Sequence, residues 1–179
     1  MFCNMTVDLA EWLADQKIDY VVGDALEGYN PIHDVTRMML NTAIAMTRRR
    51  KGLAIQNFRF SLIENPANDR SSASQPEIKL TLSEAEFEIK KKAINDYHQL
   101  KLESSQAISK FGINAFRTER FEAETAAHSG RNMISPYYER YGEQCVESGK
   151  YKHVLRQKEH LNPLYESLDE LMTQSAFVT

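Results

Sequence analysis

The ionisable and small residues that could form a site gather in residues 24–34, which read Asp-Ala-Leu-Glu-Gly-Tyr-Asn-Pro-Ile-His-Asp. This segment lies between a predicted strand and a predicted helix. Loops at the carboxyl ends of strands in α/β folds commonly bind ligands, and the first turn of a helix offers free N–H groups to developing negative charge. The position of the segment therefore favours a functional site.

His33 is the candidate metal ligand of this segment. Neutral imidazole binds zinc, and a nearby carboxylate can fix its tautomer. A catalytic zinc needs about three protein ligands and one open position. No other histidine lies within a helical turn or two of His33, so further ligands would come from remote sequence. The alternative is an ordinary hydrogen-bonded histidine.

Asp34 can be interpreted in two ways. A carboxylate beside a candidate metal ligand is typical of a functional site. Proline at the start of a helix and aspartate in its first turn are equally ordinary capping chemistry. The sequence leaves both interpretations open.

The elements that must position this segment are a strand and a helix. Residues 18–22 are β-branched and aromatic and stop at Gly23, which predicts a buried strand. After Pro31, apolar residues follow a helical period as far as the basic run 48–51 and Gly52. Alternating residues then predict a half-buried strand within 55–63, and residues 64–76 read as a surface loop.

Helical patterns dominate the rest of the chain. A short amphipathic helix is expected to end near Gln16, and a capping-box pattern at Ser83 and Glu86 starts a long helix that runs to about Leu100. Residues 122–135 have little apolar period and are predicted to form a loop or lid. Short helical patterns fill residues 136–172, with a terminal helix from Leu164.

Composition bounds the function of the chain. Its 179 residues, 42% hydrophobic and 26% charged, predict one globular domain over residues 1–179. A net charge of -3 gives no reason to expect nucleic acid or anionic lipid as a partner. Cys3 and Cys145 indicate neither a disulfide framework nor a structural zinc site. Without a signal peptide or a long apolar run, we expect a cytoplasmic protein that does not enter a membrane.

The order of these elements resembles the later half of PIG-L-type (LmbE-like) zinc-dependent N-deacetylases. The match rests on the acidic loop, Asn30-Pro31-Ile32-His33-Asp34 at the start of a long helix, and the strand at 57–63. Weaker support comes from residues 86–99 and Phe116-Arg117-Thr118-Glu119, and from a tail like the C-terminal extension of some members, at 137–143 and 149–160. The resemblance implies a partial doubly wound (Rossmann-like) α/β sheet with flanking helices and a helix-rich C-terminal half.

The resemblance also implies roles for individual residues. In that family a His-Pro-Asp-His-like motif opens the helix; its last histidine binds zinc and its first helps to stabilise the oxyanion. By this match His33 is the zinc ligand and Asn30 stands at the oxyanion position, where it can donate a hydrogen bond but cannot become a cation. Asp24 and Glu27 are the nearest candidate acid–base groups. The implied reaction is removal of an acetyl group from an N-acetylated sugar or a related small polar metabolite by zinc-activated water.

The chain departs from the family at its front. Members begin with a strand leading to a His-Pro-Asp-Asp-like motif, which supplies two zinc ligands and the general base, and this chain has no such motif. We expect either the C-terminal portion of a longer protein or a relative that has lost hydrolysis. An exposed sheet edge would follow, which predicts a homo-oligomer or pairing with a partner segment. The competing hypothesis is a non-enzymatic α/β module that binds a partner chain or a small ligand.

Tyrosines form a further candidate feature near the C-terminal end. Tyr137, Tyr138 and Tyr141 resemble an aromatic platform that faces a sugar, but their helical spacing favours packing in a core or interface. The basic run 48–51 could contact an anion, although a solvated helix end explains it more simply.

Overall fold

The computed structural model of the chain describes residues 1–67, 76–124 and 133–174. These residues form two compact units: Met1–Leu62 with Ala123–Thr179, and Ile63–Glu122. One parallel and one antiparallel strand pair, accompanied by many helices, confirm the predicted helix-rich α/β class. The prediction of a single domain stays a prediction, and each unit is described by itself.

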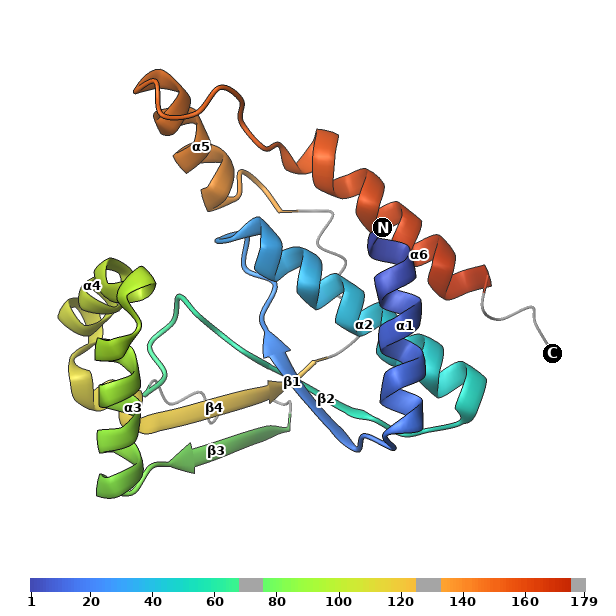
Figure 1. Cartoon of the computed structure of the whole chain (residues 1–179), viewed down its shortest axis with the longest axis horizontal. Coiled ribbons are helices and arrows are strands. Elements are labelled where there is room, and N and C mark those ends of the chain that lie inside the picture. Colours follow the sequence, from blue (N-terminus) through green and yellow to red (C-terminus); the bar gives the residue numbers. More distant parts are fainter. Residues whose placement is uncertain (68–75, 125–132, 175–179) are drawn as a thin grey trace. The chain divides into compact units, whose positions relative to one another are not determined.

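A β-α-β motif forms the centre of the first unit (Figure 1). β1 (Tyr20–Asp24) and β2 (Gln56–Phe60) are parallel, in a register that runs from Tyr20 opposite Gln56 to Asp24 opposite Phe60. The helix α2 (Pro31–Lys51) connects them. The predicted order of strand, loop and helix is therefore confirmed, with the second strand shorter than the predicted span. The prediction that the first strand is buried is wrong, because Tyr20 and Val22 of β1 are 59% and 45% exposed.

Both ends of α2 have well-defined caps. The Asn30 side chain accepts a hydrogen bond from the Ile32 N–H at 3.0 Å, and Pro31 occupies the first turn, where its missing N–H costs nothing. Gly52 ends the helix with φ of 66°, in the left-handed region that glycine adopts without strain. Arg48 and Arg49 of the basic run donate to the carbonyls of Ile55 and Met172, so these two arginines serve the fold.

Helices from both ends of the chain cover α2. α1 (Phe2–Asp15) shares one core cluster with it. α5 (Tyr137–Glu147), the π-helical turn η4 (Gln157–Leu161) and α6 (Asn162–Gln174) contribute to the other. The first cluster contains Ala10, Leu13, Ala43, Ile44, Met46 and Ile55. The second contains Val35, Met38, Met39, Tyr138, Leu161, Tyr165 and Leu168. The C-terminal segment is therefore part of the same core as the helix that opens at the candidate site.

The second unit is built around an antiparallel strand pair. β3 (Glu77–Thr81) pairs with β4 (Thr118–Ala123), from Glu77 opposite Glu122 to Thr81 opposite Thr118. Between them run α3 (Glu84–Asp96), η1 (His98–Leu100), α4 (Lys101–Phe111) and η2 (Ile113–Arg117). The capping box at Ser83 and Glu86 is confirmed. The sequence analysis did not identify either strand, and the helix it predicted ends at Asp96 rather than near Leu100.

Two further predictions concern the loops and the absence of a membrane-spanning helix. Part of each predicted loop, residues 68–75 and 125–132, lies outside the described residues. None of the helices in the described parts of the chain combines the length and the apolar character needed to cross a bilayer.

Gly23 is required by the packing of α2 on β1. A Cβ at this position would lie 2.9 Å from Arg37 Nη2 and 2.9 Å from Leu40 Cδ2. The Arg37 side chain is buried and held by hydrogen bonds, so it cannot move aside without losing them. We expect Gly23→Ala to lower the unfolding free energy by about 1–3 kcal/mol, measured by urea denaturation. In the double variant Gly23→Ala, Leu40→Ala, the loss of unfolding free energy should be smaller than the sum of the two single losses, because the shorter side chain removes one of the clashes. A loss equal to that sum would contradict the clash.

Tyr138 and Tyr165 predict a loss of stability at alkaline pH. Burial, reinforced by the negative charge of Asp34, raises the pKa of both phenols. Above about pH 10 both phenols therefore stay protonated in the folded chain but ionise in the unfolded chain. Their contribution to the unfolding free energy is fully present below about pH 10 and falls as the pH rises above it.

We expect the double variant Tyr138→Phe, Tyr165→Phe to show a shallower fall in unfolding free energy between about pH 10 and about pH 12 than the wild type. Tyr151→Phe, at an exposed tyrosine, is the matched control and should change nothing. Equal slopes for the wild type and the double variant would contradict the prediction.

Candidate functional site

The end of β1 and the first turn of α2 bring Asp24 and His33 together. His33 Nδ1 lies 2.8 Å from Asp24 Oδ2, and the two side chains are 37% and 21% exposed. Nδ1 itself is buried, and its contact with Asp24 is a close approach without the alignment of a hydrogen bond. The exposed part of the imidazole is the rest of the ring, which includes Nε2. A carboxylate at this distance holds one ring nitrogen and leaves the other to a ligand.

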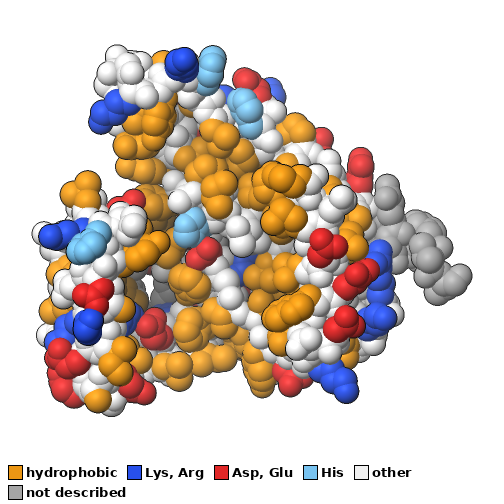
Figure 2. Space-filling model, in the orientation of Figure 1, with side chains coloured by type: hydrophobic (Ala, Val, Ile, Leu, Met, Phe, Trp, Pro, Cys, Tyr) orange, Lys and Arg blue, Asp and Glu red, His pale blue; other side chains and the backbone are white. Residues whose placement is uncertain are grey.

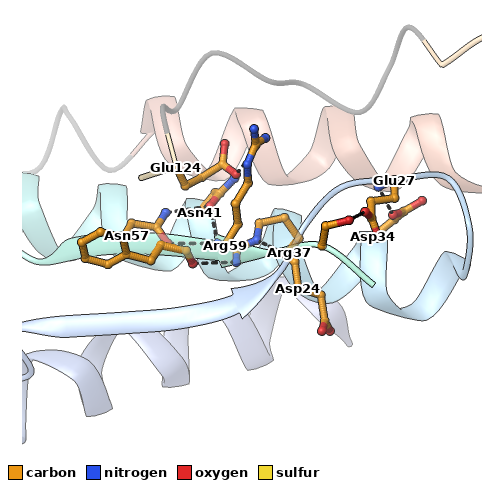
Figure 3. Close-up of polar contacts among 10 residues, drawn as sticks. Asp24, Glu27, Asp34, Arg37, Asn41, Asn57, Arg59 and Glu124 are labelled. Carbon is orange, nitrogen blue, oxygen red and sulfur yellow. Dashed lines mark hydrogen bonds and ion pairs between the residues drawn. The ribbon is translucent and has the colours of Figure 1, made fainter. Parts of the chain in front are cut away.

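A buried arginine fixes the backbone that carries Asp24. Arg37, in the second turn of α2, is 1% exposed, and its Nε donates to the Asp24 carbonyl oxygen. Figure 3 shows the guanidinium of Arg37 reaching toward Asn57, while the Asp24 carboxylate points away from it. The backbone of Asp24 is thus bound to Arg37, and its side chain is left to face His33.

The same guanidinium also donates hydrogen bonds to β2. Its Nη1 donates to Asn57 Oδ1 at 2.9 Å, its Nη2 donates to the Phe58 carbonyl at 3.0 Å, and the Asn57 amide in turn donates to Asn41 Oδ1 at 2.9 Å. Burial lowers the pKa of Arg37, while the charges of Glu124 and Asp24 act in the opposite direction. Arginine is so strong a base that the group remains a cation at neutral pH. It therefore acts as a permanently charged clamp between the two parallel strands.

Glu124 brings a carboxylate to this cation network (Figure 3). Its side chain is 2% exposed, and its Oε2 lies 3.7 Å from Arg59 Nη1. Its backbone N–H donates to the Asn57 carbonyl at 2.8 Å, which fixes the segment beside β2. The first unit therefore has a carboxylate next to its two strand-associated arginines, as a buried cation requires.

Two of the loop's acidic side chains serve as braces. Both Asp34 oxygens accept hydrogen bonds from the loop, at 3.1 Å from the Glu27 N–H and 3.1 Å from the Gly28 N–H. Glu27 in turn accepts from the Ser61 hydroxyl and, at 3.0 Å, from the Leu62 N–H, beyond the end of β2. Asp34 is 1% exposed, and its burial raises the pKa while the two N–H bonds lower it. Asp34 therefore has a structural role, but it holds the loop rather than capping α2, whose cap is Asn30.

The side chain of Asn30 has two polar groups with different roles. Its Oδ1 caps α2, while its Nδ2 is the group that can donate to a ligand. The role of Asn30 at an oxyanion stays a prediction. The loop thus brings Asp24 and His33 into contact, places Asn30 beside them in the chain, and directs Glu27 to the end of β2.

The C-terminal segment holds the loop from the other side. Gly28 has φ of 65°, and a Cβ there would lie 2.8 Å from Met133 Sδ and 2.9 Å from Pro136 Cβ. The Tyr138 N–H lies 3.4 Å from the Gly28 carbonyl oxygen. The start of α5 is therefore in close contact with the loop that carries the candidate site.

The described residues supply too few ligands for a zinc ion. In residues 1–67, 76–124 and 133–174 no three His, Cys, Asp or Glu side chains are grouped to hold a metal. The His33 imidazole with its Asp24 carboxylate matches one ligand and its supporting group. Alone, it does not make a zinc site of the usual three protein ligands or more.

Arg37 and Asn57 are the positioning residues that sequence reasoning missed. Arg37 stands three and seven residues before Leu40 and Ile44, on a face of α2 that packs into the core. A basic residue on such an apolar stripe signals a buried cation that needs several acceptors. That signal was present in the sequence, but the acceptors are on other elements and could not be read from it.

The chain was compared with protein-family models, curated proteins and solved structures. No family model matches it, and no curated protein or solved structure matches it significantly. The assignment of the site therefore depends on the geometry above.

We expect Arg37 and His33 to differ sharply in their effect on stability. Arg37→Met leaves the Asp24 and Phe58 carbonyls and the Asn57 side chain without their buried donor, which should lower the unfolding free energy by about 3 kcal/mol or more. His33→Ala removes a partly exposed ring and should cost less than about 2 kcal/mol.

Urea denaturation of both variants, with Arg50→Met at the exposed end of α2 as the control, measures these costs. A His33→Ala cost above that of Arg37→Met would show that the histidine is structural.

Proposed function

We propose that the chain is a deacetylase-like module related to zinc-dependent hydrolases of N-acetylated sugars, incomplete or inactive by itself. The observation that carries the proposal is the Asp24–His33 pair at the carboxyl end of a parallel strand. Ligand sites of α/β folds form at this edge, and carboxylate-supported histidines are typical metal ligands. The sequence resemblance supplies the choice of reaction.

Each polar residue of the loop would have a separate role in such a site. A proton on His33 Nδ1 would face the Asp24 carboxylate, which would favour this tautomer and make the other ring nitrogen the electron-pair donor. The Asn30 Nδ2 group would donate to a carbonyl or oxyanion of the substrate. Zinc, when bound, supplies the activation of water. The described residues provide one donor to it, so no catalytic step is assigned to the metal.

A second candidate function is a non-enzymatic module that binds a small polar ligand or a partner chain. The observation that favours it is that Glu27 and Asp34 are committed to holding the loop. Neither is then available as an acid–base group. Zinc binding separates the two candidates, because the first requires His33 to contribute to it and the second does not.

We expect the purified chain to bind zinc weakly and through His33. Isothermal titration with zinc should give a lower affinity for His33→Ala and an unchanged affinity for His153→Ala, a matched variant at an exposed histidine. Acetate release from N-acetylglucosamine should stay at the level of a no-enzyme blank, because the motif for the base and two further ligands is missing from the sequence.

Two outcomes would count against this account. Equal zinc affinity for the wild type and His33→Ala would remove the histidine from the metal site and favour the second candidate. Robust zinc-dependent acetate release by the wild type would show that the chain is a complete enzyme.

A further inference from the structure

The strand β1 has one edge that is open to a further strand. Among the described residues it pairs with β2 alone. The Asp19 carbonyl accepts a hydrogen bond from β2 and the Ala25 N–H donates one to it, at 2.8 Å each. Because backbone groups alternate between the two sides of a strand, the odd-numbered residues between these two also bond to β2. The backbone groups of Tyr20, Val22 and Asp24 therefore point to the other side.

The same residues carry the exposed side chains of β1. Val21 packs against the core cluster shared by α1 and α2, and a Cβ on Gly23 would meet Leu40 of α2. Tyr20 and Val22 lie on the opposite face and are exposed. Figure 2 shows hydrophobic side chains at the surface over the region of β1. The outward backbone groups and the exposed apolar side chains thus form one surface.

β1 has none of the features that usually block pairing at a sheet edge. It contains no proline and no lysine, and its register with β2 runs without a bulge. Its one charge, on Asp24, is at its end, and tyrosine and valine both favour extended backbone. An edge of this kind is a template for another strand.

A second copy of β1 matches this edge when the two strands run antiparallel. Only even-numbered residues have outward groups, so an even-numbered residue must lie opposite an even-numbered one. The two-fold register centred on Val22 places Val22 opposite itself and Tyr20 opposite Asp24, and it uses all three outward residues. No charge lies opposite a like charge in this register.

This register also defines the hydrogen bonds between the copies. The two Val22 residues exchange a pair of N–H to carbonyl bonds. Each Asp24 N–H donates to the Tyr20 carbonyl of the other copy. The Asp24 carbonyl already accepts from Arg37 Nε, so the same guanidinium that fixes this residue to α2 also fixes the end of the edge.

We propose that the chain forms a two-fold dimer through antiparallel pairing of β1 with β1 of a second copy. The self-complementary register selects a second copy over an unrelated strand. Opposite residues of an antiparallel pair lie on the same face, so Tyr20 of the second copy stands beside Asp24 and the adjoining His33. The dimer thus adds a phenol to the candidate site. This interface does not depend on the reaction proposed above.

Sedimentation velocity of the full chain, from micromolar to submillimolar concentration, tests the dimer. The wild type should show a monomer–dimer equilibrium. Val22→Lys and Val22→Glu each place like charges opposite one another at the two-fold axis, so each should weaken the dimer about tenfold or more. An equimolar mixture of the two variants places opposite charges there and should dimerise again. Leu102→Lys, at an exposed leucine of the other unit, is the matched control and should change nothing.

Hydrogen exchange of the wild type tests the register without any variant. The amides of Val22 and Asp24 should become protected as the protein concentration rises, whereas those of Val21 and Gly23 should be protected throughout because they bond to β2. A wild type that stays monomeric, or exchange at Val22 that does not change with concentration, would overturn the proposal. So would a dimer that folded Val22→Lys leaves intact, or a mixture of the two charged variants that does not dimerise.

Discussion

The first unit depends on one buried cation, the guanidinium of Arg37. Placing a charge inside a core is costly unless hydrogen-bond acceptors surround it. Here the acceptors are the Asp24 and Phe58 carbonyls and the Asn57 side chain, which belong to the two parallel strands. The requirement to satisfy this one group therefore fixes α2 against both strands, and it explains why β1 carries a glycine at position 23.

The candidate site inherits its geometry from that arrangement. Arg37 binds the backbone of Asp24, and the carboxylate of Asp24 lies against His33 in the first turn of α2. Asp34 and Glu27 hold the intervening loop by accepting its N–H groups and those beyond β2. The loop thus separates residues that support the fold from the polar groups left for a ligand, on Asn30 and on His33 with its supporting Asp24.

The sequence predicted the local features well because local chemistry determines them. Pro31 and Gly52 mark the ends of α2, and Ser83 with Glu86 marks the start of α3. The sequence did not predict elements whose partners are remote in the chain. β3 and β4 are stabilised by pairing with each other, and β3 follows a polar stretch whose composition is typical of a loop. At the site, position and periodicity were enough to locate His33. The sequence could not show which carboxylate does what. Asp24 faces the histidine, whereas Glu27 and Asp34 hold the loop, and these roles depend on contacts with loop amides and with the residues after β2.

The central claim is that Asp24 holds His33 Nδ1 and leaves Nε2 as the donor. The tautomer of the neutral imidazole tests it most directly, by long-range nitrogen–proton NMR correlation. The account predicts a proton on Nδ1 in the wild type and a loss of that preference in Asp24→Ala. A proton on Nε2 in the wild type would contradict it, because an unprotonated Nδ1 would then face the carboxylate oxygen without a hydrogen between them.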